Sequence, residues 1–580
     1  MRRSEFYMPS PTPFNKLAEV SEKILATTKR LEKMDAAGSF LSNAHSDEIE
    51  AASLLLIGRP FPRTSQRTLD LDWSALYKIL QELLRPSSEL ISELFAQSGD
   101  IGEVVNQLFL HSGKIRQKTL FTASLSIQEV YSIFMEIADV QGPGSRKRKT
   151  ALLRSLFTRA TPLEAKYLAK ILVGDQRIGF SEGMLESTIA RKLDLSLDLV
   201  RRANMLRGNI GEVAQIAFTE GADGLEKVKL HPFTPLLPML ASQAENVEDA
   251  LQTHDGTSAF ETKIDGARVQ IHLQRQNDKH PVRIYSKRLT EVTLSFPDLV
   301  ELVEREVKTQ SCIFEGEVLA MDAEGRPYPF QHLMRRFRRV RNVEEIMAEL
   351  PVTLFLFDLL MIDGEVLIDT PYTTRREKLD KVRGTIPLVD QLVSSKVDEV
   401  TTFFDKAIEA GHEGLVAKRL DSTYQPGIRG KAWLKIKRSM ETLDLVIIAA
   451  EWGTGRRHKW LSDYHLAAQD QETGEYHMLG KTFKGLTDAE FAEITQRLLE
   501  LKIEQTRGTV RVQPRIVVEV EYDEIQRSPT YQSGMALRFA RIKRLRYDKG
   551  PEDADTIQRV QALYDSQFSR KAASDLVGRS

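Results

Sequence analysis

The sequence predicts a multidomain chain in which an all-α N-terminal region precedes an α+β region and a small C-terminal β-barrel. Three observations support this prediction. With 580 residues, the chain is longer than one hydrophobic core normally organises. Apolar residues recur at helical spacing up to about residue 235. Beyond that point, short strand-like runs dominate to the end of the chain.

The helical region is predicted over residues 1–235. Helical periodicity is clearest in LDWSALYKILQELL (71–84), IQEVYSIFMEIADV (127–140) and PLEAKYLAKILV (162–173). Breaks rich in glycine and proline separate the periodic runs, and no sustained alternation appears among them. An all-helical domain is the simplest interpretation.

The second region is predicted over residues 236–440 and follows HPFTPLLPML (231–240), a proline-rich segment typical of a domain boundary. Alternating or apolar runs such as AFETKIDGARVQIHLQ (259–274) and VTLFLFDLLMIDG (352–364) come next. Helical segments such as FPDLVELVEREV (296–307) separate them. This pattern predicts an α+β domain built largely on antiparallel sheet.

The third region is predicted over residues 441–580. It contains strand-like runs such as LDLVIIAAEW (443–452) and RIVVEVEYDEIQ (515–526), with one helical run, DAEFAEITQRLLELK (488–502), between them. Short strands with one helix are typical of a small β-barrel such as an OB-fold. DADTIQRVQALYDSQF (553–568) predicts a final helix.

The composition is that of a soluble globular protein, with 41% hydrophobic and 28% charged residues. No apolar run reaches the length of a membrane span, and no apolar core follows the basic N-terminus as in a secretory signal. The single cysteine, Cys312, excludes an intrachain disulfide and a cysteine-rich zinc site. We therefore expect no membrane association and a cytoplasmic, nucleoid-associated location.

The net charge of −1 does not indicate a nucleic-acid partner, but four local basic clusters do. They are SRKRKT (145–150), RRFRR (335–339), GRRHK (455–459) and RIKRLRYDK (541–549). One such cluster is usually a solvated surface. Several clusters in separate predicted domains favour a polyanion that contacts more than one domain.

The chemistry is indicated by the segment from Glu261 to Arg268, ETKIDGAR. It matches the K-x-D-G-x-R signature of nucleotidyltransferases that form a covalent lysyl-nucleotide. A lysine can attack the α-phosphorus of a nucleotide once it has lost its proton, and Gly266 permits a tight turn that exposes the lysine tip. On its own, the segment favours a surface turn between two strands, because D-G is common in turns.

Further motifs follow in a fixed order along the chain. They are Ser286-Lys287-Arg288, Glu315-Gly316-Glu317, Leu356-Phe357-Asp358, EGLVAK (413–418), WLKIK (433–437), RFARIKR (538–544) and RYDK (546–549). This collinear series resembles the ATP-dependent DNA ligases, most closely the archaeal and eukaryotic replicative type that some bacteria also carry. The resemblance covers nearly the whole chain and implies a helical DNA-binding domain, an adenylation (nucleotidyltransferase) domain and an OB-fold domain.

The resemblance implies a nucleotide pocket built around Lys263, the residue that becomes adenylylated. Glu261 would accept a hydrogen bond from the adenine amine, and Phe357 would stack on the purine. Arg268 and Glu317 would hold the ribose side.

The resemblance also implies phosphate and metal contacts. The phosphate-neutralising cations would be Lys418, Arg429, Lys435 and Lys437. Arg541 and Lys549 would orient the leaving pyrophosphate. Glu317 and Glu413 would place Mg²⁺, a hard cation that favours carboxylate and phosphate oxygen.

Three positions depart from the family pattern. Lys287 stands where arginine is usual, which keeps a charge in the nucleotide site but loses the bidentate fork. Glu315 stands where aspartate is usual. Gly208-Asn209-Ile210-Gly211 replaces G-D-L-G, and asparagine can still cap a helix and face a phosphate. None of these changes removes a chemical step.

A second phosphate-binding motif is not expected. Gly474–Thr482, GEYHMLGKT, resembles a P-loop but has five residues between its glycines and lies between strand-like runs.

The resemblance implies a three-step reaction with ATP and Mg²⁺ as cofactors. Lys263 takes AMP from ATP, the AMP passes to the 5′-phosphate of a nick in duplex DNA, and the 3′-hydroxyl then closes the strand. The three domains would encircle the duplex and grip its phosphates without reading its bases. The expected role is DNA replication, repair or recombination by a monomer. Whether a sliding clamp is a partner cannot be read from the sequence.

Two other classes of protein could contain the central motifs. RNA ligases and GTP-using capping enzymes share the central motifs but lack the N-terminal helical region. A DNA-binding or scaffold protein with an inactive nucleotide site would not need Lys263, Glu317, Glu413, Lys435 and Lys437 together. NAD⁺ as the main donor is disfavoured, because NAD-type ligases carry a cysteine zinc site that one cysteine cannot build.

Overall fold

The computed structural model describes residues 11–112, 124–276, 279–322, 327–328, 330–337, 342–437, 442–506 and 508–566. The chain divides into two compact units. The first comprises Met1–Leu94, Ile101–Val400 and Val416–Ile436, and the second comprises Phe95–Asp100, Thr401–Leu415 and Lys437–Ser580.

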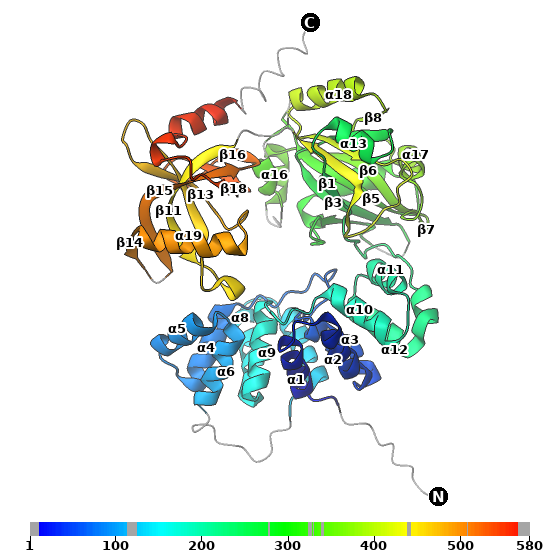
Figure 1. Cartoon of the computed structure of the whole chain (residues 1–580). Coiled ribbons are helices and arrows are strands. Elements are labelled where there is room, and N and C mark those ends of the chain that lie inside the picture. The colour runs from blue at the N-terminus through cyan, green and yellow to red at the C-terminus, as the bar shows by residue number, and fades with distance from the viewer. Residues whose placement is uncertain are drawn as a thin grey trace, which may run out of the picture. The chain divides into compact units, whose positions relative to one another are not determined.

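The N-terminal region is helical, as predicted, and Figure 1 shows its helices in blue to cyan. Its helices are α1 (Phe14–Leu25), α2 (Arg30–Ser42), α3 (Ile49–Leu56), α4 (Trp73–Leu84), α5 (Ser88–Ser98), α6 (Ile101–His111), α7 (Ile127–Asp139), α8 (Ser145–Arg159), α9 (Pro162–Val173), α10 (Glu182–Lys192), α11 (Leu197–Arg207) and α12 (Ile210–Glu226). Their apolar faces share one core, which includes Leu17, Leu55, Phe134 and Tyr167.

Local sequence explains where several helices begin. Thr161 and Glu164 form a capping box at the start of α9, with Pro162 in the first helical position. At α12 the side chain of Asn209 accepts hydrogen bonds from the backbone N–H groups of Gly211 and Glu212. The expected capping role of this asparagine is therefore present.

Two five-stranded sheets form the α+β region. The first has the order β1-β10-β9-β2-β8 and the second β4-β3-β5-β6-β7. The strands are β1 (Leu240–Gln243), β2 (Ser258–Lys263), β3 (Ala267–Gln274), β4 (Val282–Ser286), β5 (Ser311–Ala320), β6 (Val352–Ile362), β7 (Glu365–Val366), β8 (Gln391–Ser394), β9 (Gly414–Lys418) and β10 (Arg429–Lys437).

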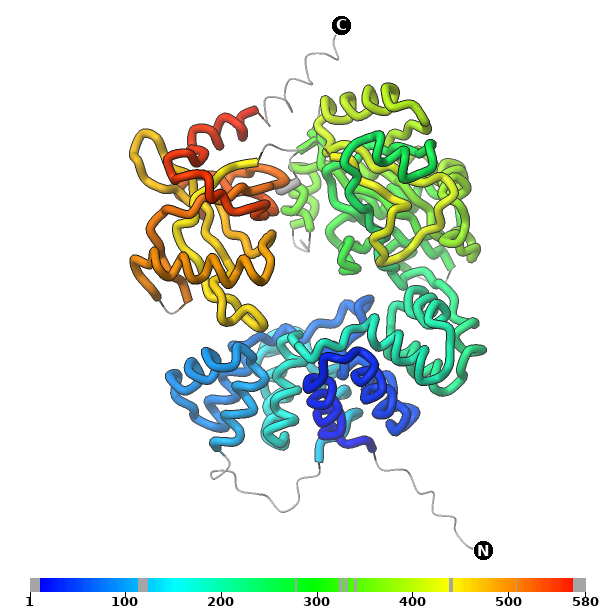
Figure 2. Tube along the Cα trace, in the orientation of Figure 1, coloured from blue at the N-terminus to red at the C-terminus, as the bar shows by residue number. Residues whose placement is uncertain are grey.

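Helices separate these strands along the chain, and the tube in Figure 2 follows the path from one to the next. They are α13 (Val247–Thr253), α14 (Pro297–Glu306), α15 (Phe330–Met334), α16 (Val343–Glu349), α17 (Tyr372–Val382) and α18 (Val397–Glu409). Strand β1 runs parallel to β10. The pairs β2–β8, β3–β4, β3–β5, β5–β6 and β6–β7 are antiparallel, as predicted.

The second unit contains a sheet of order β13-β12-β11-β15-β14, with β18 paired to β15, and a β16–β17 hairpin. The elements are β11 (Leu443–Trp452), β12 (Leu461–Gln469), β13 (Tyr476–Thr482), α19 (Asp488–Glu500), β14 (Lys502–Gln505), β15 (Thr509–Glu521), β16 (Glu524–Arg527), β17 (Met535–Arg538) and β18 (Arg541–Leu545). Many strands with one interrupting helix match the predicted OB-like region, and residues 557–566 are helical.

The structure also describes the P-loop-like segment and the lengths of the helices. The P-loop-like segment Gly474–Thr482 runs into β13, and no helix begins directly at its end. None of the described helices is both long enough and apolar enough to cross a lipid bilayer.

Candidate active site

Lys263 is the last residue of β2, at the point where the chain leaves the first sheet for the second. The five preceding residues of β2 are buried, whereas Lys263 is half-buried. The turn Ile264–Gly266 then leads into β3. Gly266 lies so close to β5 that an added Cβ would sit 2.4 Å from the carbonyl oxygen of Val318. Close packing of this turn therefore fixes the direction in which the chain leaves Lys263.

Glu261 lies two residues earlier on the same strand, with a relative exposure of 3%. Its carboxylate accepts hydrogen bonds from the Tyr372 hydroxyl and from Arg376 Nη1 at 3.2 Å. Its Oε2 atom lies 2.6 Å from Lys418 Nζ. Buried charges require such partners, and this carboxylate has two cations.

Lys418, the last residue of β9, is only 1% exposed. Its ammonium lies 4.4 Å from the ring centre of Trp433 and 4.8 Å from those of Phe357 and Tyr372. It also donates to the Phe357 carbonyl oxygen at 3.1 Å. Burial lowers the pKa of Lys418, while Glu261 acts in the opposite direction. This lysine was expected among the phosphate-neutralising cations; here its ammonium lies among aromatic rings and beside Glu261.

The guanidinium of Arg268, on β3, faces the ring of Phe357, on β6. The guanidinium carbon lies 5.2 Å from the centre of the Phe357 ring. Arg268 is held by Glu315, by the Met239 carbonyl oxygen at 2.7 Å and by the Tyr424 hydroxyl at 3.3 Å. Burial alone would lower the pKa of Arg268, but Glu315, Tyr424 and Glu317 together outweigh burial and raise it. The guanidinium is thus fixed against the aromatic wall.

The pair formed with Glu315 bears on the departure from the family pattern. Glu315 is 1% exposed and accepts from the Tyr424 hydroxyl at 2.7 Å as well as from Arg268. The buried carboxylate therefore accepts hydrogen bonds from two side chains. Glu317, two residues further along β5, is half-buried and is the cross-strand neighbour of Arg268.

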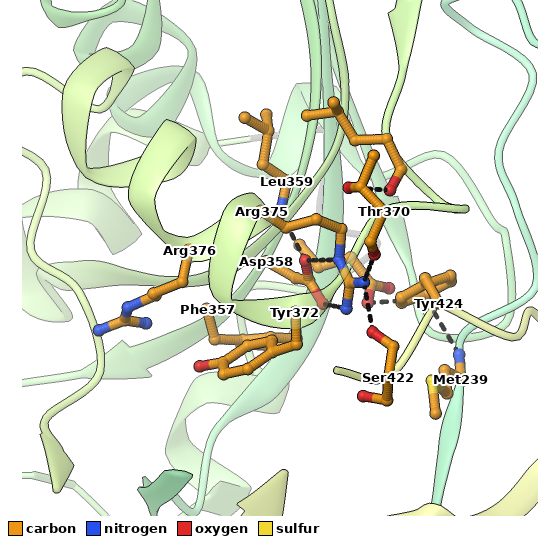
Figure 3. Close-up of polar contacts among 12 residues, drawn as sticks. Met239, Phe357, Asp358, Leu359, Thr370, Tyr372, Arg375, Arg376, Ser422 and Tyr424 are labelled. Carbon is orange, nitrogen blue, oxygen red and sulfur yellow. Dashed lines mark hydrogen bonds and ion pairs between the residues drawn. The ribbon is translucent and has the colours of Figure 1, made fainter. Parts of the chain in front are cut away.

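A buried ion pair supports the strand that carries Phe357 (Figure 3). Arg375 and Asp358 are both fully buried and are joined by two hydrogen bonds, of 2.7 and 3.0 Å. Arg375 also donates to the carbonyl oxygens of Thr370 and Ser422. These contacts join β6 to the first turn of α17 and to the loop after β9. The Arg375–Asp358 ion pair therefore holds the part of β6 that carries Phe357.

Lys287 follows β4 and is exposed. Partial desolvation of its ammonium, followed by the neighbouring cations Arg268, Lys263 and Arg429, lowers the pKa of Lys287, and Glu317 acts in the opposite direction. These groups are therefore close enough to interact electrostatically, and their contact with phosphates stays a prediction. Arg429, at the start of β10, is exposed and donates to the Ala241 carbonyl oxygen at 2.8 Å.

The end of β10 carries Lys435 and Lys437, both half-buried. Lys437 Nζ lies 2.8 Å from Glu413 Oε2, just before β9 begins. Within the described ranges, no three metal-ligating side chains of the His, Cys, Asp and Glu types gather at one point. Glu317 and Glu413 offer hard oxygen donors, so a bound Mg²⁺ would need further oxygens from nucleotide phosphates or water.

Arg541 and Lys549 belong to the second unit. Arg541 is exposed at the start of β18, opposite Glu521 of β15. Lys549 is half-buried, and its ammonium lies 2.6 Å from Asp444 Oδ2. Asp444 also pairs with Arg546 at 3.0 Å. The pyrophosphate-orienting role stays a prediction for both residues.

The basic clusters are less uniformly exposed than the sequence suggested. Arg336 of the cluster 335–339 is fully buried, paired with Asp298 and stacked over Phe296. Residues 338 and 339 lie outside the described ranges. In the cluster 145–150, Lys149 is buried and paired with Asp70, whereas residues 146–148 are exposed.

Sequence reasoning gave no role to three residues that surround Glu261: Tyr372, Arg376 and Gln391. They come from α17 and β8, more than a hundred positions after Glu261. The run YTTRRE resembles any polar helix start, and only the tertiary contacts reveal its connection to the site. Trp433 begins the motif WLKIK (433–437), but the motif does not predict that its ring lies beside Lys418.

Comparison with known proteins identifies the chain. Residues 238–437 match the model described as "ATP dependent DNA ligase domain", residues 13–190 match "DNA ligase N terminus" and residues 457–549 match "ATP dependent DNA ligase C terminal region". These three matches, in this order, define an ATP-dependent ligase.

Similar full-length relatives agree. A DNA ligase of Thermococcus fumicolans is 43% identical over 562 residues, covering 96% of this chain and 99% of the relative. DNA ligase 1 of Korarchaeum cryptofilum is 42% identical, covering 96% and 98%. The solved structure described as "Pmar-Lig_PreS3" has a TM-score of 0.55 at 16% identity, covering 91% of this chain and 99% of that one, a likeness in fold alone.

The chain belongs to the ATP-dependent DNA ligase family, in its archaeal type. It uses ATP to seal nicks in DNA, in the context of replication and repair.

Proposed function

We propose that sealing proceeds through a lysyl-AMP intermediate formed on Lys263. The observation that carries this proposal is the position of Lys263 at the end of a buried strand, in the electrostatic neighbourhood of Lys287 and two residues after Glu261. A lysine nucleophile needs a fixed direction of approach and a partner that binds the base. The close-packed Gly266 turn and the buried carboxylate of Glu261 support both requirements.

The remaining pocket residues divide by the part of ATP that they would contact. Phe357 stacks on the purine while Glu261 accepts from its amine, and Arg268 with Glu317 faces the ribose. The cations proposed to neutralise the phosphates are Lys287, Lys418, Arg429, Lys435 and Lys437. Charge stabilisation of this kind supplies most of the catalysis in phosphoryl-type transfer. For Lys418 the role would require its ammonium to leave Glu261, so it is the least supported member of this group.

Mg²⁺ is proposed as the metal cofactor, with Glu317 and Glu413 as its protein donors. When bound, it would offset negative charge on the phosphates. Glu413 already pairs with Lys437, so binding of the ion and this ion pair would be coupled.

The reaction balances in three transfers. The neutral Lys263 amine forms a P–N bond to the α-phosphorus, the bond to pyrophosphate breaks, and the nitrogen loses a proton to solvent. The 5′-phosphate of the nick then attacks the same phosphorus, and the lysine nitrogen regains a proton as it leaves. Finally the 3′-hydroxyl attacks the 5′-phosphorus with loss of its proton, and AMP leaves. Arg541 and Lys549 are proposed to orient pyrophosphate in the first transfer only.

DNA binding is proposed to involve three functional domains, residues 1–235, 236–440 and 441–580. The ligand is nicked duplex DNA, held through its phosphates. We propose that the enzyme acts as a monomer, and that recombination is a further setting for the same activity.

The experiment that tests this function compares wild type with Lys263→Ala and Lys263→Arg. Both variants should lose covalent labelling by ATP radiolabelled in its α-phosphate, because arginine stays protonated and cannot attack phosphorus. Both should still seal a nick that already carries AMP, because the nucleophile of the last step is the DNA 3′-hydroxyl.

The matched control is Lys396→Ala, which removes an exposed lysine paired with Glu399. This variant should label and seal like wild type. A persistent adduct in Lys263→Ala, or peptide mapping that finds AMP on Lys418 or Lys435, would contradict the assignment.

A further inference from the structure

The carboxylate of Glu261 is held by side chains from three separate elements. Tyr372 and Arg376 lie four residues apart on α17, so they project from the same face of the helix. Gln391 is the cross-strand partner of Glu261 on β8. Lys418 comes from β9. We call Tyr372, Arg376, Gln391 and Lys418 the Glu261 network.

The two carboxylate oxygens have different partners. Oε1 accepts from the Tyr372 hydroxyl and from Arg376 Nη1, and Gln391 Nε2 lies 3.5 Å away. Oε2 has Lys418 as its partner among the described residues, at 2.6 Å. An ionised carboxylate oxygen can accept two hydrogen bonds. Oε1 is therefore satisfied by protein, whereas Oε2 keeps room for one more donor.

The direction of the Tyr372 proton is also set. Gln391 Nε2 donates to the Tyr372 oxygen at 2.5 Å, so the single hydroxyl proton is directed to Glu261. Burial, followed by the charge of Glu261, raises the pKa of Tyr372 well above its ordinary value, and the hydroxyl stays a donor. Arg376 is anchored in turn by the Val389 carbonyl oxygen at 2.7 Å. The network thus keeps Glu261 in one position beside a permanent cation.

We propose that Tyr372, Gln391 and Arg376 are positioning residues that hold the Glu261 carboxylate as a hydrogen-bond acceptor and thereby select purine nucleotides with an amino group at C6. This inference rests on the proposed function for the statement that Glu261 faces the base. An acceptor-only group pairs with an amino N–H and opposes a carbonyl oxygen, which is also an acceptor. A 6-oxo purine would leave the buried Oε2 unpaired by the ligand and placed against a second oxygen.

The test measures lysyl-nucleotide formation with ATP and with inosine triphosphate, which carries an oxygen at C6. Wild type should prefer ATP, and Tyr372→Phe should reduce the ATP-to-ITP ratio of kcat/KM about ten-fold, the effect of losing one hydrogen bond to a charged group. The loss should appear mainly as a higher KM for ATP. Sealing of a pre-adenylylated nick should fall less than lysyl-AMP formation, because its adenylate is already bonded to the DNA.

Two further variants separate positioning from folding. Gln391→Met keeps the side-chain volume and removes the donor to Tyr372, so it should lower the ratio in the same direction. The double variant should be no worse than Tyr372→Phe alone, since both changes disable one network. Tyr464→Phe is the matched control: it removes a buried hydroxyl in the second unit that has no hydrogen-bond partner among the described residues. Its ratio should equal that of wild type.

An unchanged ratio in Tyr372→Phe and Gln391→Met, or an equal loss for both nucleotides, would overturn the inference. Failure of the proposed function looks different. In that case wild type would carry its label on a residue other than Lys263, or none at all, whatever the ratio in the variants.

Discussion

Gly266 lies against strand β5 so closely that one methyl group would not fit. A Cβ added there would meet backbone at 2.4 Å, the Val318 carbonyl oxygen, and the Glu317 Cγ atom at 2.9 Å. Backbone cannot rotate away like the end of a long side chain, so the turn itself would have to move. The sequence pattern D-G suggested a tight turn, but this contact shows a second requirement for glycine, which is the absence of a side chain.

Gly266→Ala should therefore slow lysyl-AMP formation by about ten-fold, because overpacking costs about 1–3 kcal/mol and displaces the turn that follows Lys263. Single-turnover labelling with ATP measures the rate. Gly508→Ala is the control, since its added Cβ meets nothing within 4 Å. If Gly266→Ala labels at the wild-type rate, the turn does not determine the position of Lys263.

The motifs predicted which residues belong to the site, but not how all of them pack. The motifs predicted a set of nucleotide-binding residues, and four of that set, Lys287, Arg268, Lys263 and Arg429, interact electrostatically in the structure. The burial of Lys418 among three rings could not be predicted in the same way. Its ring partners Phe357, Tyr372 and Trp433 come from three separate segments, and no local pattern records their packing.

At the scale of elements, local periodicity predicted most helices and strands, but pairing between strands is non-local. The alternation in residues 259–274 indicated two strands around a turn. The structure shows that β2 and β3 belong to different sheets, so the turn after Lys263 connects two sheets and is not a hairpin. That difference follows from the partners β8, β9, β4 and β5, which lie elsewhere in the sequence.

The proline-rich linker after the helical region is likewise fixed by β3. The backbone N–H of Phe233 donates to His272 Nδ1 at 2.9 Å, and that of Leu236 donates to the Gln270 side chain at 2.8 Å. His272 is fully buried, and its Nε2 atom lies 2.9 Å from Gln270 Oε1. Nδ1 must accept from Phe233, so the imidazole is required in its neutral form.

This requirement predicts a pH dependence. Burial, followed by the charge of Arg283, lowers the pKa of His272 to about 3. Between pH 6.5 and 3 the unfolded state binds the extra proton, so the stability contributed by neutral His272 is complete above about pH 6.5 and declines as the pH falls. From pH 7 to pH 5 the loss should be about 2 kcal/mol.

Urea unfolding of wild type and His272→Gln at both pH values measures this effect. The variant should be less stable at pH 7, but its free energy of unfolding should fall by about 2 kcal/mol less on acidification. Equal falls in the two proteins would show that His272 is not held neutral.

For the molecule as a whole, the net charge of −1 conceals local basic clusters, of which residues 145–150 are one. Helix α8 begins at Ser145 without an acidic residue in its first turn. Instead Arg146, Lys147 and Arg148 are exposed there. Cations at a helix N-terminus oppose the helix dipole, whereas anions are favoured. This arrangement costs stability in the free protein and suits a phosphate group of DNA.

Lys147→Ala should therefore weaken binding to a nicked duplex and reduce its salt dependence. For wild type, the logarithm of the binding constant should fall linearly with the logarithm of salt concentration, and each phosphate contact contributes about 0.9 to the slope. The variant should lose about one such contact, equally for duplexes of different sequence, because phosphates carry no base information.

The control is Lys16→Ala, an exposed lysine already paired with Glu19. Titration of fluorescent nicked duplexes at several salt concentrations measures both slopes. A slope unchanged by Lys147→Ala, or a loss confined to one DNA sequence, would exclude a phosphate contact at the start of α8.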